Sequence, residues 1–213
     1  MIFKRKSSLT GEDLGGVRSM QSELDFITYL EAFIPLSVEA KTALSGVLQI
    51  RQYAKRAHIV PLNGVNDVIS FVVKGCVREY YLNDQTEEVV VWFGLEKDIA
   101  VSLPSFISQQ PSHTAIQAIE PTKVIQISRA DLYQLYDQFH EIERLGRIIA
   151  EHYLMNSDAY IKELQTQNAA ERYQHLMEQK PQILQRVPLS MVASFLGISG
   201  ETLSRIRAKR VSR

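Results

Sequence analysis

The chain has 213 residues, 24 Lys and Arg against 24 Asp and Glu, and 45% hydrophobic residues. This length holds one core of ordinary size and a small second domain. No signal peptide is predicted, because the first basic residues lead into polar ones, and no apolar run approaches the ~18 residues of a membrane span. The single cysteine, Cys76, excludes an internal disulfide and an all-cysteine iron–sulfur cluster within one chain. We expect a cytoplasmic protein with no cofactor, no metal and no membrane association.

The amino-terminal segment divides into two parts. Residues 1–19 contain three glycines and few large apolar residues, which is typical of a loose arm or an upstream extension, with Met20 as an alternative start. Residues 22–48 have helical spacing of apolar positions and a break at Pro35. The sequence therefore predicts two helices ahead of the next region.

From residue 48 to residue 128 the pattern changes to short β-prone runs separated by turns. The predicted strands are 59–60, 68–73, 76–82, 88–93, 114–119 and 123–128. Their spacing of about 8–12 residues, with no long amphipathic helix between them, favours an antiparallel roll or barrel over a doubly wound sheet.

Residues 130–165 have helical spacing again, first over 131–139 and then over a longer helix from Glu141 to about Leu164. The longer helix carries a stripe at alternating spacings of three and four, which is typical of a helix packed along another helix. We interpret this stripe as a dimer seam, and the alternative is that it packs only on its own roll. The seam residues are Ile142, Leu145, Ile149, His152, Asn156 and Ala159.

The last third of the chain is basic. Residues 168–213 hold eight Lys and Arg against three Asp and Glu, so the rest of the chain has an acidic excess of the same size. Asn168-Ala-Ala-Glu171 resembles a capping box that opens a helix over 169–178. Positive charge concentrated in one small segment is what a polyanion-binding module needs.

Residues 188–210 have the spacing of a helix-turn-helix. Gly197 suits a turn with positive φ, and Ser199 is a good N-cap for the second helix. Val192, Ala193 and Leu203 form its inner faces. The other face of the second helix carries residue types that reach phosphates and base edges. The predicted DNA-contacting residues are Ser199, Gly200, Glu201, Thr202, Ser204, Arg205, Arg207, Lys209 and Arg210.

The chain resembles the Crp/Fnr family of bacterial transcription regulators over roughly residues 25–210. The resemblance rests on the predicted strands, on the long helix and on the segment from Ala193 to Arg207. The resemblance implies an α+β fold with an antiparallel β-roll like a cyclic nucleotide-binding domain, flanking helices, a long dimerisation helix and an all-α helix-turn-helix end with a reduced or absent wing. It also implies double-stranded DNA, a second copy of the chain, RNA polymerase and an unknown small-molecule effector as partners. The implied divisions are 1–19 (arm), 20–139 (sensor), 140–167 (dimerisation helix) and 168–213 (DNA-binding domain).

The family's recognition pattern Glu-x-x-Ser-Arg is present as Glu201, Ser204 and Arg205. Arg205 suits a bidentate contact to guanine and Glu201 suits cytosine N4, so the resemblance implies a half-site with a G·C pair in a near-palindromic operator. Gly200 departs from the family, which often has Arg at that position.

The sensor departs further from the family. Cyclic-nucleotide members hold the ligand with a Gly-Glu-Leu turn and an Arg-Ser or Arg-Thr pair, where this chain has Val101-Ser102-Leu103 and Ser112-His113. These five residues are the candidate ligand pocket. A buried phosphate needs a fixed cation, which Ser112 lacks and His113 supplies only when protonated. We therefore predict that cyclic AMP does not bind in the usual mode.

Other functions find little support in the sequence. The five histidines lack the paired spacing of a cupin metal site, and no nucleophile signature or phosphate loop is present, so we do not expect an enzyme. Cys76 is interpreted as a buried thiol rather than a redox sensor, and Trp92 as a residue that packs in or beside the roll. The alternative function is a ligand-sensing roll whose terminal helices contact a protein instead of DNA.

Overall fold

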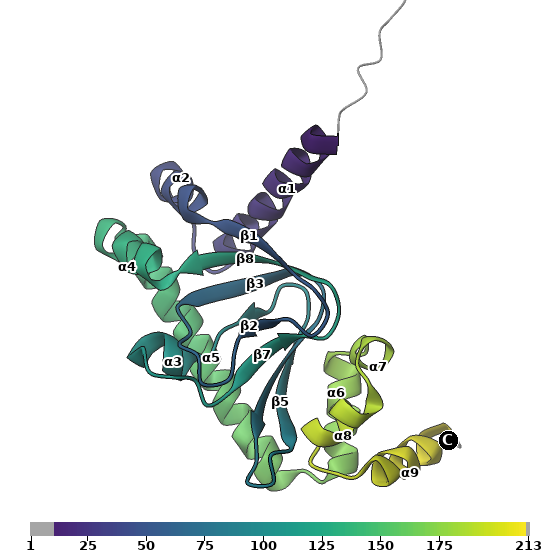
Figure 1. Ribbon diagram of the computed structural model, residues 1–213. Helices are drawn as coiled ribbons and strands as arrows, with labels where there is room; N and C mark the ends of the chain where they lie inside the picture. The colour runs from purple at the N-terminus through teal and green to yellow at the C-terminus, as the bar shows by residue number, and fades with distance from the viewer. Residues whose placement is uncertain (1–10, 212–213) are drawn as a thin grey trace, which may run out of the picture.

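The computed structural model describes the backbone of residues 11–211 and the side chains of residues 21–208. Its centre is a roll of two four-stranded antiparallel sheets with the orders β1-β8-β3-β6 and β2-β7-β4-β5 (Figure 1). The predicted antiparallel roll is thus confirmed. The strands are β1 (Gln49–Tyr53), β2 (His58–Val60), β3 (Val68–Lys74), β4 (Val77–Leu82), β5 (Glu88–Gly94), β6 (Ile99–Ala100), β7 (Ala115–Ala118) and β8 (Thr122–Ser128).

Small and β-branched side chains fill one of the three cores, between the two sheets. Val72, Val77, Ile116 and Val124 are fully buried there, and Trp92 packs against the cluster. β-branched residues suit a pleated strand whose alternate side chains face the core, so the predicted strands form where such residues alternate.

Helices cover the outer face of the first sheet and one side of the second. The helices are α1 (Gly11–Glu31), α2 (Val38–Val47), α3 (Leu103–Ser108), α4 (Arg129–Gln138), α5 (His140–Thr166), α6 (Ala169–Gln179), α7 (Ile183–Arg186), α8 (Leu189–Phe195) and α9 (Gly200–Val211). The second core joins α1, α2, α4 and α5 to the first sheet, with Phe26 and Phe71 rings 4.8 Å apart. In Figure 1 the long α5 runs past the roll toward the carboxyl-terminal helices.

The carboxyl-terminal helices pack on the roll of their own chain. The third core joins Tyr80, Val90 and Phe93 of the second sheet to apolar residues of α6 to α9, among them Leu176 and Val192. In Figure 1 these helices lie beside β5, the outermost strand of that sheet. The predicted DNA-binding end is therefore held against the β-roll.

The structure differs from the expected elements at α1, β1, β6, α3 and α7. α1 begins at Gly11, so the backbone of residues 11–19 is helical instead of forming a loose arm. Residues 1–10 lie outside the described part. The strand β1 was missed because its sequence is mostly polar, and β6 because it has only two residues. The six-residue α3, also unpredicted, begins with Pro104 near its start.

Candidate DNA interface and sensor pocket

α8 and α9 are joined by a four-residue turn, as the helix-turn-helix prediction required. Gly197 has φ +66°, the left-handed conformation that glycine adopts without a Cβ clash. The Ile198 N–H donates to the Ala193 carbonyl at 3.0 Å, which closes the turn. The Ser199 hydroxyl accepts from the Thr202 N–H at 3.2 Å, so Ser199 is the N-cap of α9.

The inner faces of these helices are buried as predicted. Val192, Ala193, Leu196 and Leu203 are 0–4% exposed and belong to the core that α6 shares with the second sheet. Arg172 of α6 also donates to the Leu196 carbonyl at 2.8 Å. The turn and the start of α9 therefore rest on a fixed support.

The outer face of α9 is open to solvent. Ser199, Gly200, Glu201, Ser204, Arg205 and Arg207 are exposed and Thr202 is half-buried. Arg205 lies 3.7 Å from Glu201 one turn earlier, with side chains 74% and 87% exposed. The side chains of Lys209 and Arg210 lie outside the described residues. The described part of the predicted surface is thus contiguous, polar and accessible.

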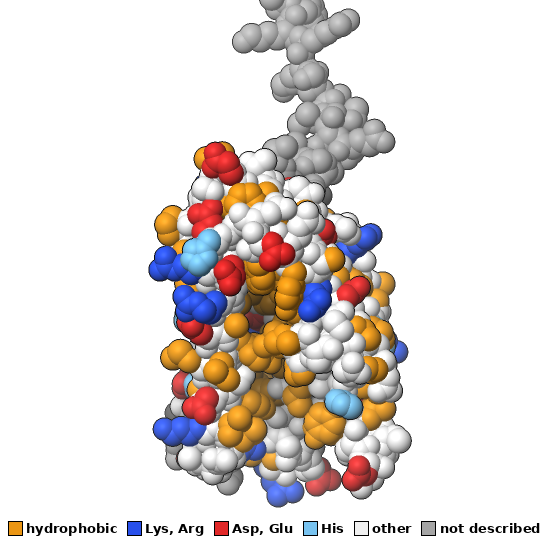
Figure 2. Space-filling model, turned by 90° about the vertical axis from the view of Figure 1, so that its left-hand side faces the viewer, with side chains coloured by type: hydrophobic (Ala, Val, Ile, Leu, Met, Phe, Trp, Pro, Cys, Tyr) orange, Lys and Arg blue, Asp and Glu red, His pale blue; other side chains and the backbone are white. Residues whose placement is uncertain are grey.

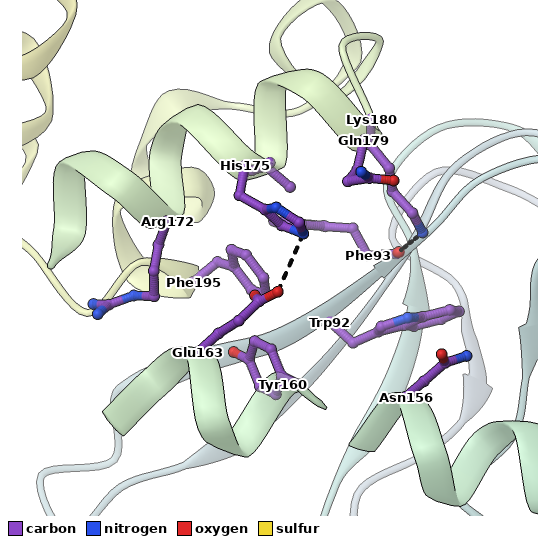
Figure 3. A pocket seen from close by; sticks show the side chains of 11 residues that line it. Trp92, Phe93, Asn156, Tyr160, Glu163, Arg172, His175, Gln179, Lys180 and Phe195 are labelled. Atoms are coloured by element: carbon purple, nitrogen blue, oxygen red, sulfur yellow. Dashed lines mark hydrogen bonds and ion pairs between the residues drawn. The ribbon is translucent and has the colours of Figure 1, made fainter. Parts of the chain in front are cut away.

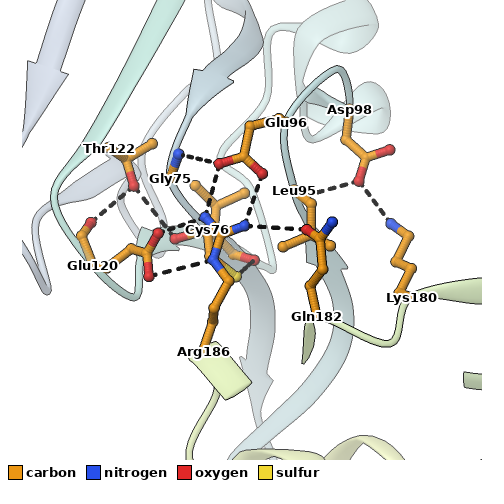
Figure 4. Close-up of polar contacts among 11 residues, drawn as sticks. Gly75, Cys76, Leu95, Glu96, Asp98, Glu120, Thr122, Lys180, Gln182 and Arg186 are labelled. Atoms are coloured by element: carbon orange, nitrogen blue, oxygen red, sulfur yellow. Dashed lines mark hydrogen bonds and ion pairs between the residues drawn. The ribbon is translucent and has the colours of Figure 1, made fainter. Parts of the chain in front are cut away.

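Arg186 links α7 to the turns between β5 and β6 and between β7 and β8 at one end of the roll (Figure 4). Its guanidinium donates to both carboxylate oxygens of Glu96 at 2.7 and 2.8 Å and to Glu120 at 2.5 Å. Glu96 also accepts from the Gly75 N–H at 2.8 Å. The charged hydrogen bond from Arg186 is the main reason that the pKa of Glu96 falls to about 2, although burial opposes it.

Two further contacts connect the same parts of the chain. Lys180 donates to Asp98 at 2.7 Å and to the Phe93 carbonyl at 3.0 Å. The Ser194 hydroxyl of α8 accepts from the Val90 N–H and donates to the Glu88 carbonyl, at 3.1 and 3.2 Å. Ser194 thereby pairs main-chain groups of the edge strand β5 that would otherwise be open. These contacts leave no signal in the sequence, because their partners are 80 or more residues apart.

The structure does not bring the five predicted pocket residues into one cavity. Val101 and Leu103 line an apolar cavity of about 480 Å³ between the first sheet and helices α1 to α5, on the face shown in Figure 2. Ser102 and Ser112 are buried against each other, with their hydroxyls 2.7 Å apart. His113 is exposed beside a separate surface depression.

The described polar side chains around Ser102 and Ser112 include an acidic residue and no cation, so they do not suit a bound phosphate. Ser112 contacts Thr114, whose hydroxyl donates to the Glu79 carboxylate at 2.6 Å. Burial raises the pKa of Glu79, with the hydrogen bond from Thr114 opposing it. The side-chain partners of Ser102 and Ser112 carry no positive charge. A bound phosphate would have to displace a serine–serine hydrogen bond beside an acidic group.

The predicted dimer seam differs in burial along the length of α5: its first part is buried and its last part is exposed. Ile142 and Leu145 are 2% and 3% exposed in the core of their own chain, so this part of the stripe packs on its own roll. Ile149 packs partly against the same core, and His152 meets the Phe33 ring edge-on at 5.6 Å. Asn156 and Ala159 are exposed. The apolar residues that α5 exposes instead are Tyr153, Leu154, Met155, Ile161 and Leu164.

Two classes of site are not found in the described residues. No group of three His, Cys, Asp or Glu side chains is placed to hold a metal ion within residues 21–208. No described helix is long and apolar enough to cross a membrane.

Comparison with known proteins agrees with this architecture. Residues 50–139 match the cyclic nucleotide-binding domain family, whereas no curated protein sequence matches the chain. The structure is similar to FixK2 from Bradyrhizobium japonicum, with a TM-score of 0.68 and 19% identity over 78% of this chain and 85% of that one. It is also similar to the c-di-GMP-responsive global regulator CLP of Xanthomonas campestris, with a TM-score of 0.64 and 15% identity over 83% of this chain and 92% of that one. A third similar structure is the catabolite activator protein of Thermus thermophilus, with a TM-score of 0.53 and 19% identity over 86% of this chain and 87% of that one. The chain therefore contains a domain of the cyclic nucleotide-binding family over residues 50–139 and has the fold of the Crp/Fnr regulators.

Proposed function

We propose that the protein is a dimeric, sequence-specific DNA-binding transcription regulator in which α9 enters the major groove. The observation that carries this proposal is the accessible polar face of α9 on a buried, N-capped support. A helix that reads base edges needs an exposed face of hydrogen-bonding side chains and a fixed orientation. CLP, which shares the fold, is a global regulator.

Within the proposed interface, Arg205 and Glu201 read bases. Arg205 donates to guanine O6 and N7, and Glu201 accepts from cytosine N4 on a neighbouring pair. Arg205 Nη2 lies 3.7 Å from Glu201 Oε2, so the two side chains lie side by side on one face of α9. The phosphate contacts fall to the N-terminal turn of α9 and its basic end: Ser199, Gly200, Thr202, Ser204, Arg207, Lys209 and Arg210.

A second copy of the chain would supply the second α9 helix that a two-fold symmetric DNA site requires. Leu154, Ile161 and Leu164 lie seven and three residues apart along α5, a coiled-coil spacing, and are 46–70% exposed. Pairing two α5 helices through this stripe would bury it and present two α9 helices to a near-palindromic operator. The earlier positions Ile142 and Leu145 then support α5 from its own roll.

In this proposal the β-roll controls DNA binding by α9 without a cyclic nucleotide bound in the usual mode. The Ser102–Ser112 hydrogen bond and the nearby Glu79 support this, since neither offers a cation to a phosphate. A different small molecule is then the effector, and RNA polymerase is the further partner that control of transcription requires.

Selection from a randomised duplex library at two salt concentrations tests the proposal. A near-palindrome with half-sites about one helical turn apart should emerge, with affinity that falls steeply with salt. Arg205→Ala should then weaken specific binding by about 1–3 kcal/mol and relax the preference at one base pair. Arg51→Ala, which removes the same charge from β1, should leave selection unchanged. Failure to enrich any sequence would point instead to terminal helices that contact a protein.

A further inference from the structure

A second cavity lies where the roll, the long helix and the carboxyl-terminal helices meet (Figure 3). Its volume is about 290 Å³, close to the lower end of small-molecule sites. Trp92 comes from β5, Asn156 and Tyr160 from α5, and Gln179 from α6. A ligand here would touch all three parts of the chain at once.

The walls of this junction cavity present flat aromatic surfaces. Figure 3 shows Trp92 lying between Asn156 on one side and Gln179 with Lys180 on the other. The indole folds over Gly94, where a Cβ atom would come within 2.4 Å of the ring. Tyr160 and Phe195 stack with ring centroids 6.0 Å apart and planes 17° apart. Such surfaces favour a planar ring system.

The charged groups around the cavity already have partners. Glu163 pairs with His175 at 3.2 Å, and Lys180 pairs with Asp98 at 2.7 Å. Arg172 donates to the carbonyls of Gln167 and Leu196, although its buried Nε has no hydrogen bond. Glu163 and Lys180 are thus paired within the protein, and Arg172 leaves one buried N–H donor free, so an uncharged ligand with an acceptor group can bind without breaking an ion pair.

The neutral polar groups of the cavity, in contrast, have no hydrogen-bond partner among the described residues, and the amides of Asn156 and Gln179 are exposed to solvent. Among the described residues, no hydrogen bond involves the amides of Asn156 and Gln179, the indole N–H of Trp92 or the hydroxyl of Tyr160. Burial raises the pKa of Tyr160, so its hydroxyl remains a donor at neutral pH. Two amides, which each donate and accept, match the edge of a heteroaromatic ring.

We propose that the junction cavity binds an uncharged, planar heteroaromatic ligand of nucleobase or nucleoside size. The ring lies against Trp92, and its polar edge bonds to Asn156 and Gln179. Because Asn156 is on α5 and Gln179 on α6, the ligand strengthens the docking of the carboxyl-terminal helices on the roll. The effect on DNA reading rests on the proposed function, whereas binding itself does not.

Trp92 is the single tryptophan of the chain, so its fluorescence reports directly on the cavity. The full-length protein, excited at the red edge of the indole band, is titrated with adenosine and guanosine, with cyclic AMP as the charged counterpart and ribose as a compound that lacks the planar ring. We expect saturable changes in emission with the nucleosides, no change with ribose, and no gain in affinity from the phosphate of cyclic AMP. Tight binding of cyclic AMP without binding of adenosine would overturn the proposal.

Variants locate the site. Asn156→Ala and Gln179→Ala should each weaken nucleoside binding about threefold to tenfold, the loss of one neutral hydrogen bond. Gln174→Ala, an exposed glutamine of α6 outside the cavity, should leave affinity unchanged. Binding that is insensitive to both cavity variants, or no emission change with any nucleoside, would refute the assignment. If a variant misfolds, NMR contacts between ligand and Trp92 ring protons in the unaltered protein decide: their presence supports the site and their absence overturns it.

Discussion

Replacing Arg186 by Met tests how the carboxyl-terminal helices are held on the roll. Arg186→Met keeps the length and apolar stem of the side chain but removes every hydrogen bond to Glu96 and Glu120. The two carboxylates then lose their shared cation, while Glu96 keeps only the Gly75 N–H. We expect the variant to be less stable and its helices to dock more loosely.

The expected magnitude follows from Glu96. Its pKa falls from 4.5 to about 2 in the folded protein, chiefly because of Arg186; a pKa lowered by that much corresponds to about 3 kcal/mol. Its side chain is 35% exposed, so solvent screening reduces this to roughly half. Glu120, 32% exposed, adds about 0.5 kcal/mol. Arg186→Met should therefore lower the free energy of unfolding by about 2 kcal/mol at neutral pH.

The pH dependence gives an independent check. A lowered pKa means that Glu96 stabilises the fold fully above pH 4.5 and that this contribution disappears as pH falls toward 2. The unaltered protein should lose stability across this window, and Arg186→Met should lose less of it.

Urea unfolding followed by Trp92 fluorescence measures both effects. Arg207→Met, which changes an exposed arginine of α9, is the matched control and should stay within about 0.5 kcal/mol of the unaltered protein. A double-mutant cycle with Glu96→Gln should give a coupling energy of about 1–2 kcal/mol. If Arg186→Met unfolds at the same urea concentration as Arg207→Met and keeps the acid sensitivity of the unaltered protein, the reasoning is refuted.

Three further predictions concern the thiol, the turn and a cap. Burial raises the pKa of Cys76 to about 12, and the residue has no exposed surface. A disulfide reagent at pH 8 should therefore react only with urea-unfolded protein. Reaction of the native protein would contradict this packing. Gly197→Ala should destabilise by about 1 kcal/mol in urea unfolding because of its positive φ, whereas Gly46→Ala in α2, equally open to a Cβ, should stabilise by up to about 1 kcal/mol. Asn168→Ala removes the capping box of α6 and should lower the thermal midpoint by the equivalent of about 1 kcal/mol, a loss absent from the exposed Gln174→Ala.

Local signals in the sequence were sufficient for most elements. The capping box at Asn168 and Glu171 and the turn at Gly197 form as predicted, because each depends on residues within a few positions of one another. The six predicted strands form because their apolar, β-branched runs differ from the surrounding turns. The polar strand β1 has no such signal and exists because β8 pairs with it over five residues.

Of the two candidate interfaces, the proposed DNA-contacting surface could be predicted from local periodicity and the dimer seam could not. The exposed face of α9 follows from helical periodicity once Leu203 is inside, so the residues proposed to contact DNA were accessible to sequence reasoning. The stripe on α5 did not reveal which side would be covered: periodicity gives the angle between side chains but not the identity of the neighbour. The roll took Ile142 and Leu145 and left Leu154 and Ile161 exposed.

The sequence by itself determined the class of fold, the order of the longer helices and of the apolar strands, and the surface that is proposed to read DNA, because these depend on propensity, periodicity and charge along the chain. Only the tertiary structure decided the rest. The ion pairs of Arg186, the closure of Ser102 on Ser112 and the junction cavity around Trp92 join residues far apart in sequence. Nothing local in the chain encodes these distances, which arise when three separate cores pack against one another.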